Sequence, residues 1–413
     1  MGLHYRAWTI QLKAESPLMI GGHRLDNNRY ASLDYIPHHV LQAAFARAIL
    51  ETHEHYSLDK HTNDKLYYID PNHQEITDDG CHPQWQPWFR VFPQLCFNDA
   101  RPMGRTLYTP TTFACKHSSS HPLRETLLER YLSRNQRSQL AQFKCPVCQG
   151  RLERKNGWRM PSDEKLYYRK ITRVGLDERR LVSRDEHLYT LSVLEPYRLI
   201  DPENGQAEPL YFYGTVYAPQ EADLSLDEAI IHVGAYLTSG FGRMRIRVTP
   251  ADTTNRRQAA FERWRQWQEQ AGNSSVAIQL LSDVELPLVC AVDNKYQTRE
   301  QWLAFYTQLL RQCSGLPENV TVEAAYLNSF QRRYVHNGPQ FRRADKLTTL
   351  LQQGSVFILN GPKAALEPWL DEAIQCGMPW QADDIQRRLS LDILSGEAEP
   401  SQKGGNTVES GRV

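Results

Sequence analysis

The sequence predicts an α+β fold in which the order strand, helix, strand, strand, helix, strand occurs twice. Three observations predict it. Residues 6–14 and 243–248 alternate apolar and polar side chains, as half-buried strands do. After Pro37, apolar residues recur along a single helical stripe. A second, looser round of the same order begins near Val276. Because this order is the ferredoxin-like topology, which RRM domains share, we expect two tandem ferredoxin-like domains.

The first round opens with a strand in which Trp8, Ile10 and Leu12 face one side. A helix follows Pro37, because proline suits the first helical turn. Ser225 and the two acidic residues that follow it in the chain resemble the start of a helix. A short helix up to Val233 is therefore predicted. The remaining strands of this round are predicted at 188–194, 211–217 and 243–248.

The expected domain organisation follows from where these patterns begin and end. Residues 52–187 lack periodicity, and a loop of that length is improbable, so they are predicted to form an inserted subdomain. The first domain would span 1–250, a linking helix 251–272 and a degenerate second domain 273–394. The tail from Ser395, rich in Gly, Ser, Glu and Pro, is predicted to be disordered.

The second round consists of less regular segments. The linking helix places Ala260, Phe261, Trp264 and Trp267 at helical spacing, so it should pack into the core or between domains. The strands are expected at 276–284, 320–330, 354–360 and 386–394, and the helices at 298–311 and 364–376.

Charge is unevenly distributed although the formal net charge is zero. Residues 101–184 contain 19 Lys and Arg but 7 Asp and Glu, so this segment is basic and the rest of the chain is acidic. A local positive field of this kind suits nucleic-acid contact, and it also suits a solvated, arginine-rich insertion. The sequence has neither a run of apolar residues long enough to span a membrane nor a secretion signal, so we expect a cytoplasmic protein.

The segment from His232 to Arg247 is the strongest local signal. Gly240 and Gly242 allow backbone angles closed to other residues, and their amides would suit a phosphate. In the strand that follows, Arg243, Arg245 and Arg247 line the face opposite the core, with a spacing comparable to that of phosphates on a single strand. A tight turn before a basic edge strand is the alternative interpretation.

The cysteines indicate a metal site in the insertion. Cys145-x-x-Cys148 brings two thiolates to one point, as half of a zinc knuckle does. Cys115 is the best third ligand, and His121 or His117 the fourth; Cys81 and Cys96 are held in reserve. We expect a structural zinc ion, with a simple pair of thiols as the alternative.

Several motifs together resemble the RAMP superfamily of CRISPR-associated proteins. Ser16-Pro17-Leu18-Met19-Ile20-Gly21-Gly22, then Tyr35-Ile36-Pro37, then Gly240-Phe241-Gly242-Arg243 stand in the family's order. Cys115-Lys116, Cys145-Pro146-Val147-Cys148 and Gly354-Ser355-Val356-Phe357 resemble the type III-D subunit that caps the crRNA. Two departures stand out: His38-His39 replaces a small, Gly-rich helix start, and no glycine loop precedes Arg387-Arg388.

The resemblance implies a subunit that holds the 5′ repeat-derived handle of the crRNA and caps the backbone of a type III-D effector. Its partners would be the crRNA, the large subunit and the neighbouring backbone subunit, with target RNA nearby. The residues expected to contact RNA are Gly21, Gly22, Arg24, His38, His39, Arg47, Lys116, Arg169, Lys170, Arg173, Gly240, Phe241, Gly242, Arg243 and Arg245.

By the same resemblance, a capping subunit holds RNA and does not cut it, so no catalytic residue is assigned. The alternative is an endoribonuclease that processes crRNA or cleaves target RNA. Its base would be His38 or His39 without metal, or its acid Asp26 or Asp34 with metal.

Overall fold

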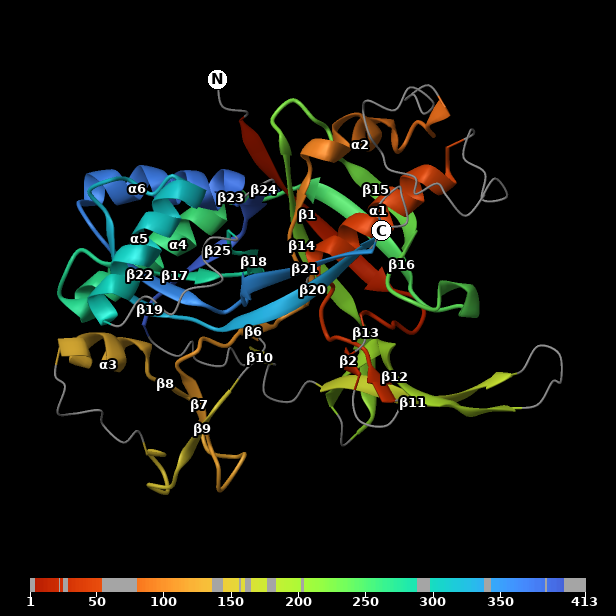
Figure 1. Ribbon diagram of the computed structural model, residues 1–413, viewed down its shortest axis with the longest axis horizontal. Coiled ribbons are helices and arrows are strands. Elements are labelled where there is room, and N and C mark those ends of the chain that lie inside the picture. Colours follow the sequence, from red (N-terminus) through yellow and green to blue (C-terminus); the bar gives the residue numbers. More distant parts are fainter. Residues whose placement is uncertain are drawn as a thin grey trace, which may run out of the picture.

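The computed structural model describes residues 4–21, 23–24, 29–53, 80–135, 144–155, 157–159, 165–176, 183–201, 204–287, 298–337, 343–382 and 385–396. It shows a mixed α/β protein with several antiparallel sheets (Figure 1). None of the helices in these ranges is both long enough and apolar enough to cross a membrane.

The first sheet has the strand order β15-β16-β1-β14-β4, with β5 also paired to β14. β1 lies at its centre and runs antiparallel to both β14 and β16. The strand bounds are β1 Tyr5–Ala14, β4 Cys96–Phe97, β5 Arg101–Pro102, β14 Tyr211–Pro219, β15 Leu226–His232 and β16 Arg243–Pro250. The strands predicted at 6–14, 211–217 and 243–248 are therefore present.

One face of this sheet is covered by the helices α1 (His38–Glu51) and α2 (Gln86–Val91). The predicted side chains of β1 point into this core, together with Met244, Ile246 and Val248 of β16. Phe45 of α1 stacks on Trp88 of α2 with ring centroids 4.7 Å apart. Because strand side chains alternate, the arginines of β16 point from the opposite face.

The helix predicted from Ser225 to Val233 is wrong, because residues 226–232 form the edge strand β15. The pairing of β15 with β16 shifts register between Leu226 and Ala229. This irregularity interrupts the period of two, so the apolar residues fall at a spacing that imitates a helix.

The strand predicted at 188–194 is present, but its expected place in the first sheet is wrong. Residues 188–194 belong to β12 (Ser183–Asp201), which lies in a separate sheet with the order β11-β12-β3-β2. The place beside β14 is taken by β4 and β5, which lie inside the segment predicted as an insertion. These strands are two residues long, too short for a period to show in the sequence.

β11 (Lys165–Leu176) and β12 form a long arm that extends away from the rest of the molecule (Figure 1). The other two strands of this sheet are short: β2 His23–Arg24 and β3 Arg29–Ala31. β13 (Gln206–Pro209) pairs with the other end of β12. The isolated bridge between Leu18 and Leu194 ties the base of the arm to the end of β1.

The second sheet has the order β19-β22-β17-β25, and all of its neighbours are antiparallel. Its strands alternate along the chain with two helices as predicted. The bounds are β17 Val276–Leu280, α5 Arg299–Ser314, β19 Thr321–Tyr326, β22 Val356–Asn360, α6 Lys363–Glu372 and β25 Leu391–Leu394. The linking helix is α4, Thr253–Ala271.

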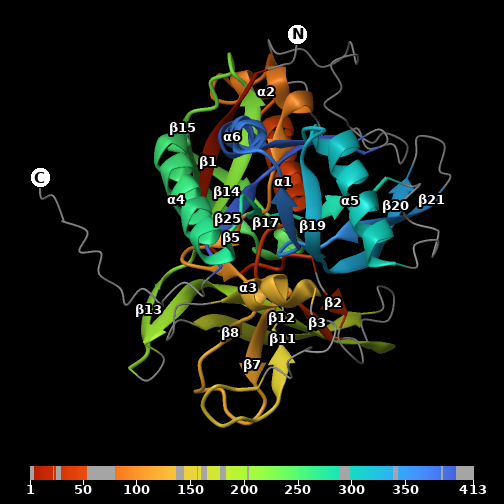
Figure 2. The ribbon, with the colours of Figure 1, turned by 90° about the vertical axis from the view of Figure 1, so that its left-hand side faces the viewer.

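Both faces of the second sheet are buried. Helices α4, α5 and α6 pack with Ile278 and Phe357 on one face. On the other face, Tyr131 of α3 (Leu127–Leu132) packs with Ala277 and Ile358. Figure 2 shows α3 between this core and the small sheet below it. Burial on both faces explains why β17 and β22 are apolar almost throughout, and why the second round lacks a clear period.

The remaining elements are short strands and hairpins. The hairpin β20 (Ser329–Asn337) and β21 (Arg343–Leu351), which pairs with β18 (Val284–Glu285), was not predicted. In the sequence, the Asn337-Gly338 pair at the end of β20 is a turn signal that could have revealed the hairpin. The others are β6 Thr106–Leu107, β7 Thr112–Cys115, β8 Arg124–Glu125, β9 Leu152–Arg154, β10 Trp158–Arg159, β23 Met378–Ala382 and β24 Ile385–Leu389.

Candidate metal centre and candidate nucleic-acid interface

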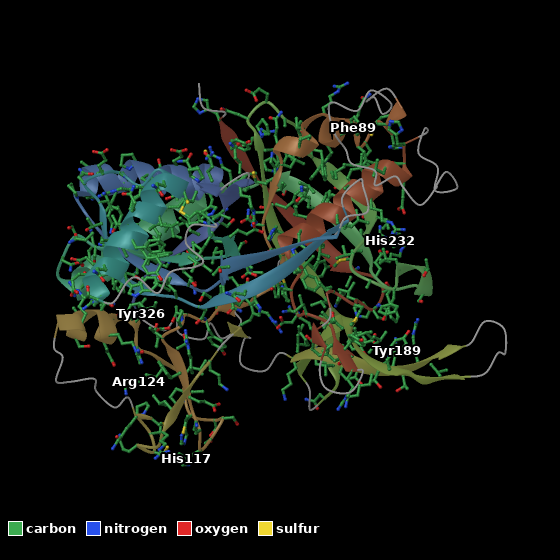
Figure 3. All side chains as sticks on the ribbon, in the orientation of Figure 1. Phe89, His117, Arg124, Tyr189, His232 and Tyr326 are labelled. Carbon is green, nitrogen blue, oxygen red and sulfur yellow. The ribbon has the colours of Figure 1, made fainter. Side chains whose placement is uncertain are left out.

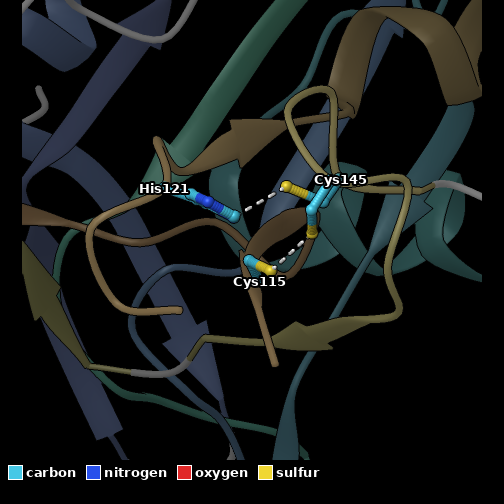
Figure 4. Close-up of side chains that lie close together, drawn as sticks. Cys115, His121 and Cys145 are labelled. Carbon is cyan, nitrogen blue, oxygen red and sulfur yellow. Dashed lines mark hydrogen bonds between the residues drawn. The ribbon is translucent and has the colours of Figure 1, made fainter. Parts of the chain in front are cut away.

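Four potential ligands meet at the end of the small sheet β8-β7-β9 (Figure 4). They are Cys115, His121, Cys145 and Cys148, whose ligand atoms all lie within 4.8 Å of one another. Cys115 Sγ is 3.5 Å from Cys148 Sγ, and Cys145 Sγ is 3.4 Å from His121 Nδ1. Three thiols and one imidazole in this arrangement could hold a metal ion.

The local backbone explains how the cysteines converge. Cys145 donates its N–H to the Gly150 carbonyl, and Gln149 donates to the Cys145 carbonyl, so residues 145–150 close a tight turn. Gln149 has a left-handed φ of 55°. A side chain on Gly150 would collide with the ring of His117. A side chain at this position, beside the metal ligands, would therefore require the exposed His117 ring to move.

Electrostatics in this cluster favour thiolate on Cys115. Burial acts to raise the pKa of Cys115, but hydrogen bonds from the His117 backbone and the His121 side chain lower it to about 6. At Cys148 the Gly150 N–H acts to lower the pKa, but burial and the neighbouring Cys115 and Cys145 raise it. Because thiolates this close repel one another, a cation between them would relieve the repulsion.

The ligand set predicted from the sequence is thus brought together by the fold. Of the two histidines left open, His121 joins the cluster, and His117 instead donates its backbone N–H to Cys115 Sγ at 3.3 Å. The reserve cysteines lie elsewhere. Cys81 is buried in the first core and Cys96 beside Tyr217.

The second candidate site is the glycine loop, residues 233–242, between β15 and β16. It packs against the segment that follows β1. Ala235 N donates to Met19 O at 2.8 Å, and Gly242 N donates to Pro17 O at 2.9 Å. Arg243 N donates to Ser16 Oγ at 2.9 Å. These bonds join the first motif of the chain to the glycine motif, although more than 200 residues separate them.

The glycines in this loop have different roles. Gly234 and Gly242 have φ of 93° and 83°, and a Cβ on either would collide with a backbone carbonyl, of Met19 and Val233 respectively. The Gly242 amide, and the space beside both glycines, are used by the protein itself. Gly240 has φ of 82° but no atom within 4 Å of where its Cβ would lie. Of these three glycines, only Gly240 leaves room for another molecule.

The arginines of β16 form the expected row, but it is not a row of bare cations. Glu15 binds both Arg243 Nε at 2.9 Å and Arg245 Nε at 2.7 Å. Glu228 binds Arg245 at 2.9 Å, and Asp227 binds Arg247 at 3.0 Å. The side chains remain 42–53% exposed. A phosphate approaching this row would have to displace these carboxylates.

The ion pairs also act on Glu15. Hydrogen bonds from Arg243 and Arg245 hold the pKa of Glu15 below its ordinary value. Glu15 was not singled out from the sequence. It lies at the end of β1, and the pairing of Lys13 with Arg245 that brings it beside these arginines cannot be seen before the sheet order is known.

Among the other residues expected to contact RNA, Arg173 lies at the glycine loop, where its Nη1 donates to Ser239 Oγ at 3.0 Å. Arg169 and Lys170 lie nearer the base of the arm, and Arg169 pairs with Glu195 at 2.5 Å. Lys116 lies beside the metal cluster. The next residue, His117, lies on a separate projection of the molecule (Figure 3).

The helix residues do not join this interface. His38 begins α1, and its Nδ1 is 3.1 Å from the buried Oδ1 of Asp99. Its ring packs edge-on against His39 at 5.3 Å. Arg47 pairs with Glu51 along the same helix. Because α1 covers the core face of the first sheet, these residues lie on the opposite side from the arginine row.

The polar loop after β1 is described only in part. Gly21 has φ of 37°. Gly22 and Asp26 lie outside the described residues, and Arg24 lies in β2 with a side chain that is not described. Asp34 accepts a hydrogen bond from Arg105 at 2.6 Å. This ion pair binds the second predicted acidic candidate to a neighbouring loop.

No family model matches the sequence, and no curated protein matches it. Among solved structures, a chain of the type III-B Cmr-beta complex bound to cognate target RNA and AMPPnP aligns over 93% of this chain and 98% of its own, at 9% identity and a TM-score of 0.37. A chain of a type IV-B CRISPR complex aligns over 60% and 91%, at 12% identity and a TM-score of 0.27. Oligomeric Cmr4 from Pyrococcus furiosus aligns over 60% and 99%, at 9% identity and a TM-score of 0.22. These identities and TM-scores are low.

Proposed function

We propose that this chain is an RNA-binding subunit of a CRISPR effector complex, of the RAMP superfamily. The observation that carries the proposal is the backbone pairing of Ser16–Met19 with the glycine loop, because it assembles the two motifs of the resemblance into one surface beside the arginine row. In this proposal both sheets belong to ferredoxin-like domains, with strand orders β16-β1-β14-β4 and β25-β17-β22-β19.

The finer proposal is a type III-D subunit that holds the 5′ handle of the crRNA and caps the backbone. It would contact the large subunit and the neighbouring backbone subunit, close to the target RNA. Arginines supply phosphate contacts and aromatic rings stack on splayed bases, which is how proteins bind single-stranded RNA. The chain would hold RNA without cutting it.

The test is RNA binding by the full chain at several salt concentrations. Arg243→Ala with Arg245→Ala should weaken binding to repeat RNA and reduce the salt slope by up to about 0.7 for each lost phosphate contact. Arg265→Ala is the matched control, since Arg265 is also exposed and ion-paired but lies on α4. Unchanged affinity and slope in the double variant would instead favour a protein-only scaffold.

We also propose that the cysteine cluster holds a structural zinc ion. Three thiolates and one imidazole form a common zinc donor set, and a closed set of four ligands suits a structural rather than a catalytic role. Elemental analysis of the purified chain should give one zinc per chain, and Cys145→Ser with Cys148→Ser should lose it. Cys313→Ser, a buried thiol of α5, should keep it.

One observation favours the ribonuclease alternative. The buried carboxylate of Asp99 orients the His38 ring, as a carboxylate does for a general base. Incubation with repeat RNA, with and without magnesium, separates the two functions. Cleavage that His38→Ala or Asp34→Ala abolishes would identify an enzyme, and recovery of intact RNA would support the binding subunit.

A further inference from the structure

Tyr236, in the glycine loop, adopts a backbone conformation that a bulky residue rarely takes. Its φ and ψ are 60° and 33°, in the left-handed region. Among the described residues, only Gln149 shares a positive φ without being glycine. Such conformations are costly for side chains with a Cβ, and they persist where the surroundings enforce them, often at binding sites. Glycine would fit this backbone without strain.

The ring of Tyr236 belongs to an aromatic group at the base of the arm. Its centroid is 6.4 Å from that of Phe241, and the rings of Tyr30 and Tyr189 meet edge to face at 6.5 Å. Phe241 is buried on a small core formed by Met19, Leu191 and Val193. The three tyrosines are only partly buried around that core, so part of each remains on the surface.

Arg173 completes this group. Its guanidinium lies 5.5 Å from the Tyr236 centroid and 5.4 Å from the Phe241 centroid. Within the described residues it has no carboxylate partner, and its one hydrogen bond is to Ser239. The arginines of β16 are by contrast all paired with acids. Arg173 is therefore a cation beside the loop that is available to bind an external anion.

We propose that Tyr236, with Tyr30 and Tyr189, forms a stacking platform for unpaired bases of a single RNA strand, and that Arg173 binds the phosphate next to the stacked base. The inference rests on the proposed function and names the residues that contact the bases. Gly240, which faces open space, lets the strand pass close to the loop. Stacking on aromatic rings tolerates any base, so the platform would add affinity more than sequence preference.

The alternative is that Tyr236 only closes the small core. The two roles predict opposite effects on stability. If the ring serves RNA, Tyr236→Gly removes the strain and should keep or raise the melting temperature of the full chain. If the ring serves the core, the same substitution exposes Phe241 and should lower it.

The experiment uses single-stranded RNA that carries 2-aminopurine, whose fluorescence falls on stacking. Tyr236→Gly should weaken binding roughly 5- to 100-fold, as loss of one stacked base does, with an unchanged salt slope and less quenching. Tyr236→Phe should behave as the native chain. Arg173→Ala should reduce the salt slope by about 0.7. Trp302→Ala, an exposed aromatic of α5, is the control and should change nothing.

The outcomes separate this inference from the proposed function. Failure of the native chain to bind RNA would remove both. If the native chain binds and the Arg243, Arg245 double variant weakens it, but Tyr236→Gly leaves affinity and quenching unchanged, only the platform is refuted. An earlier melting of Tyr236→Gly would also refute it, since the ring would then be a core residue.

Discussion

Glu15 occupies the two arginines that the sequence suggested most strongly for RNA contact. The carboxylate lies between Arg243 and Arg245, so it competes with phosphate for their Nε donors. We predict that Glu15→Gln strengthens RNA binding several-fold at low salt and steepens the salt slope by about 0.7 for each arginine that gains a phosphate. Glu262→Gln is the control, because Glu262 pairs with Arg265 of α4 and not with the arginine row of β16. Binding isotherms at four salt concentrations measure both the affinity and the salt slope. Weaker binding by the Glu15→Gln variant would mean that Glu15 positions the arginines.

The pH dependence of the ion pairs between Glu15 and the two arginines follows from the direction of the pKa shift of Glu15. The pKa of Glu15 is lowered, so its ion pairs are fully present above its ordinary pKa of 4.5 and are lost as pH falls through the lower folded value. Between neutral pH and pH 5, the native chain should therefore show no change in RNA affinity that arises from Glu15.

The residues of a site could be predicted from the sequence where their spacing alone defines the site. They could not be predicted where the pairing of strands defines it. Cys145 and Cys148 stand three positions apart, so their convergence could be predicted from the sequence. Cys115 was predicted as the third ligand and His121 or His117 as the fourth, and the fold brings Cys115 and His121 to the cluster. Glu15 and Tyr236 acquire their roles only from the pairing of β1 with β16 and from the backbone angles of the loop.

At the scale of the element, α1 is capped from outside its own sequence. Pro37 precedes the helix and offers no side-chain cap, and the first turn carries no acid. Asp99, which follows β4, accepts the His38 backbone N–H at 2.7 Å and the His38 ring at 3.1 Å. A carboxylate from another part of the chain therefore performs the task of an N-cap and meets the positive end of the helix dipole.

We predict that Asp99→Ala lowers the free energy of unfolding by about 1–3 kcal/mol, because a partly buried backbone donor loses its acceptor. Burial acts to raise the pKa of Asp99, but the His38 contacts hold it below its ordinary value of 3.8. The stabilisation is thus present above pH 3.8 and is lost as pH falls through the folded value. Urea unfolding at pH 7 and at acid pH measures it. Asp252→Ala, an exposed cap of α4, is the control, and an equal loss at both pH values would contradict the charge argument.

The small sheet β8-β7-β9 should depend on its metal. Its own apolar core is small, and the cluster at its end joins two of its loops. We predict that a chelator makes residues 115–121 and 144–151 sensitive to protease while both large sheets stay resistant. Mass spectrometry of the fragments locates the cuts, and added zinc should restore protection. Protection that survives complete metal removal would contradict a structural metal.

Sequence patterns predicted elements well where one face alone is buried, as in β1, β16 and α1. They failed where the period is interrupted or the element is too short. The irregular pairing of β15 imitates a helix, and β4 is two residues long. In the second sheet, α3 covers the face that should have been polar, so the alternation that identifies a strand is missing.

At the scale of the whole molecule, the two large sheets are joined through a buried polar cluster around Asn98. Asn98 is 2% exposed. Its Nδ2 donates to Arg388 O at 3.0 Å, and its Oδ1 accepts from Ser390 N at 2.9 Å and from Ser282 Oγ at 3.2 Å. Tyr217 Oη, in the first sheet, is 3.0 Å from Ser390 Oγ. The residue after β4 thus bonds Arg388 of β24 and two residues that flank strands of the second half, and so joins the two cores.

We predict that Asn98→Ala destabilises the chain by about 2–4 kcal/mol, because the buried N–H of Ser390 and carbonyl of Arg388 lose their partners. More informatively, it should split thermal unfolding into two calorimetric transitions, since it removes three hydrogen bonds of the buried cluster between the two cores. Asn360→Ala is the matched control: Asn360 bonds Glu323 and Ser274 within the second half, so its loss should lower stability and leave the number of transitions unchanged. A single, merely earlier transition for Asn98→Ala would mean that the contacts left in place, among them the bond between Tyr217 and Ser390, suffice to make the two cores unfold together.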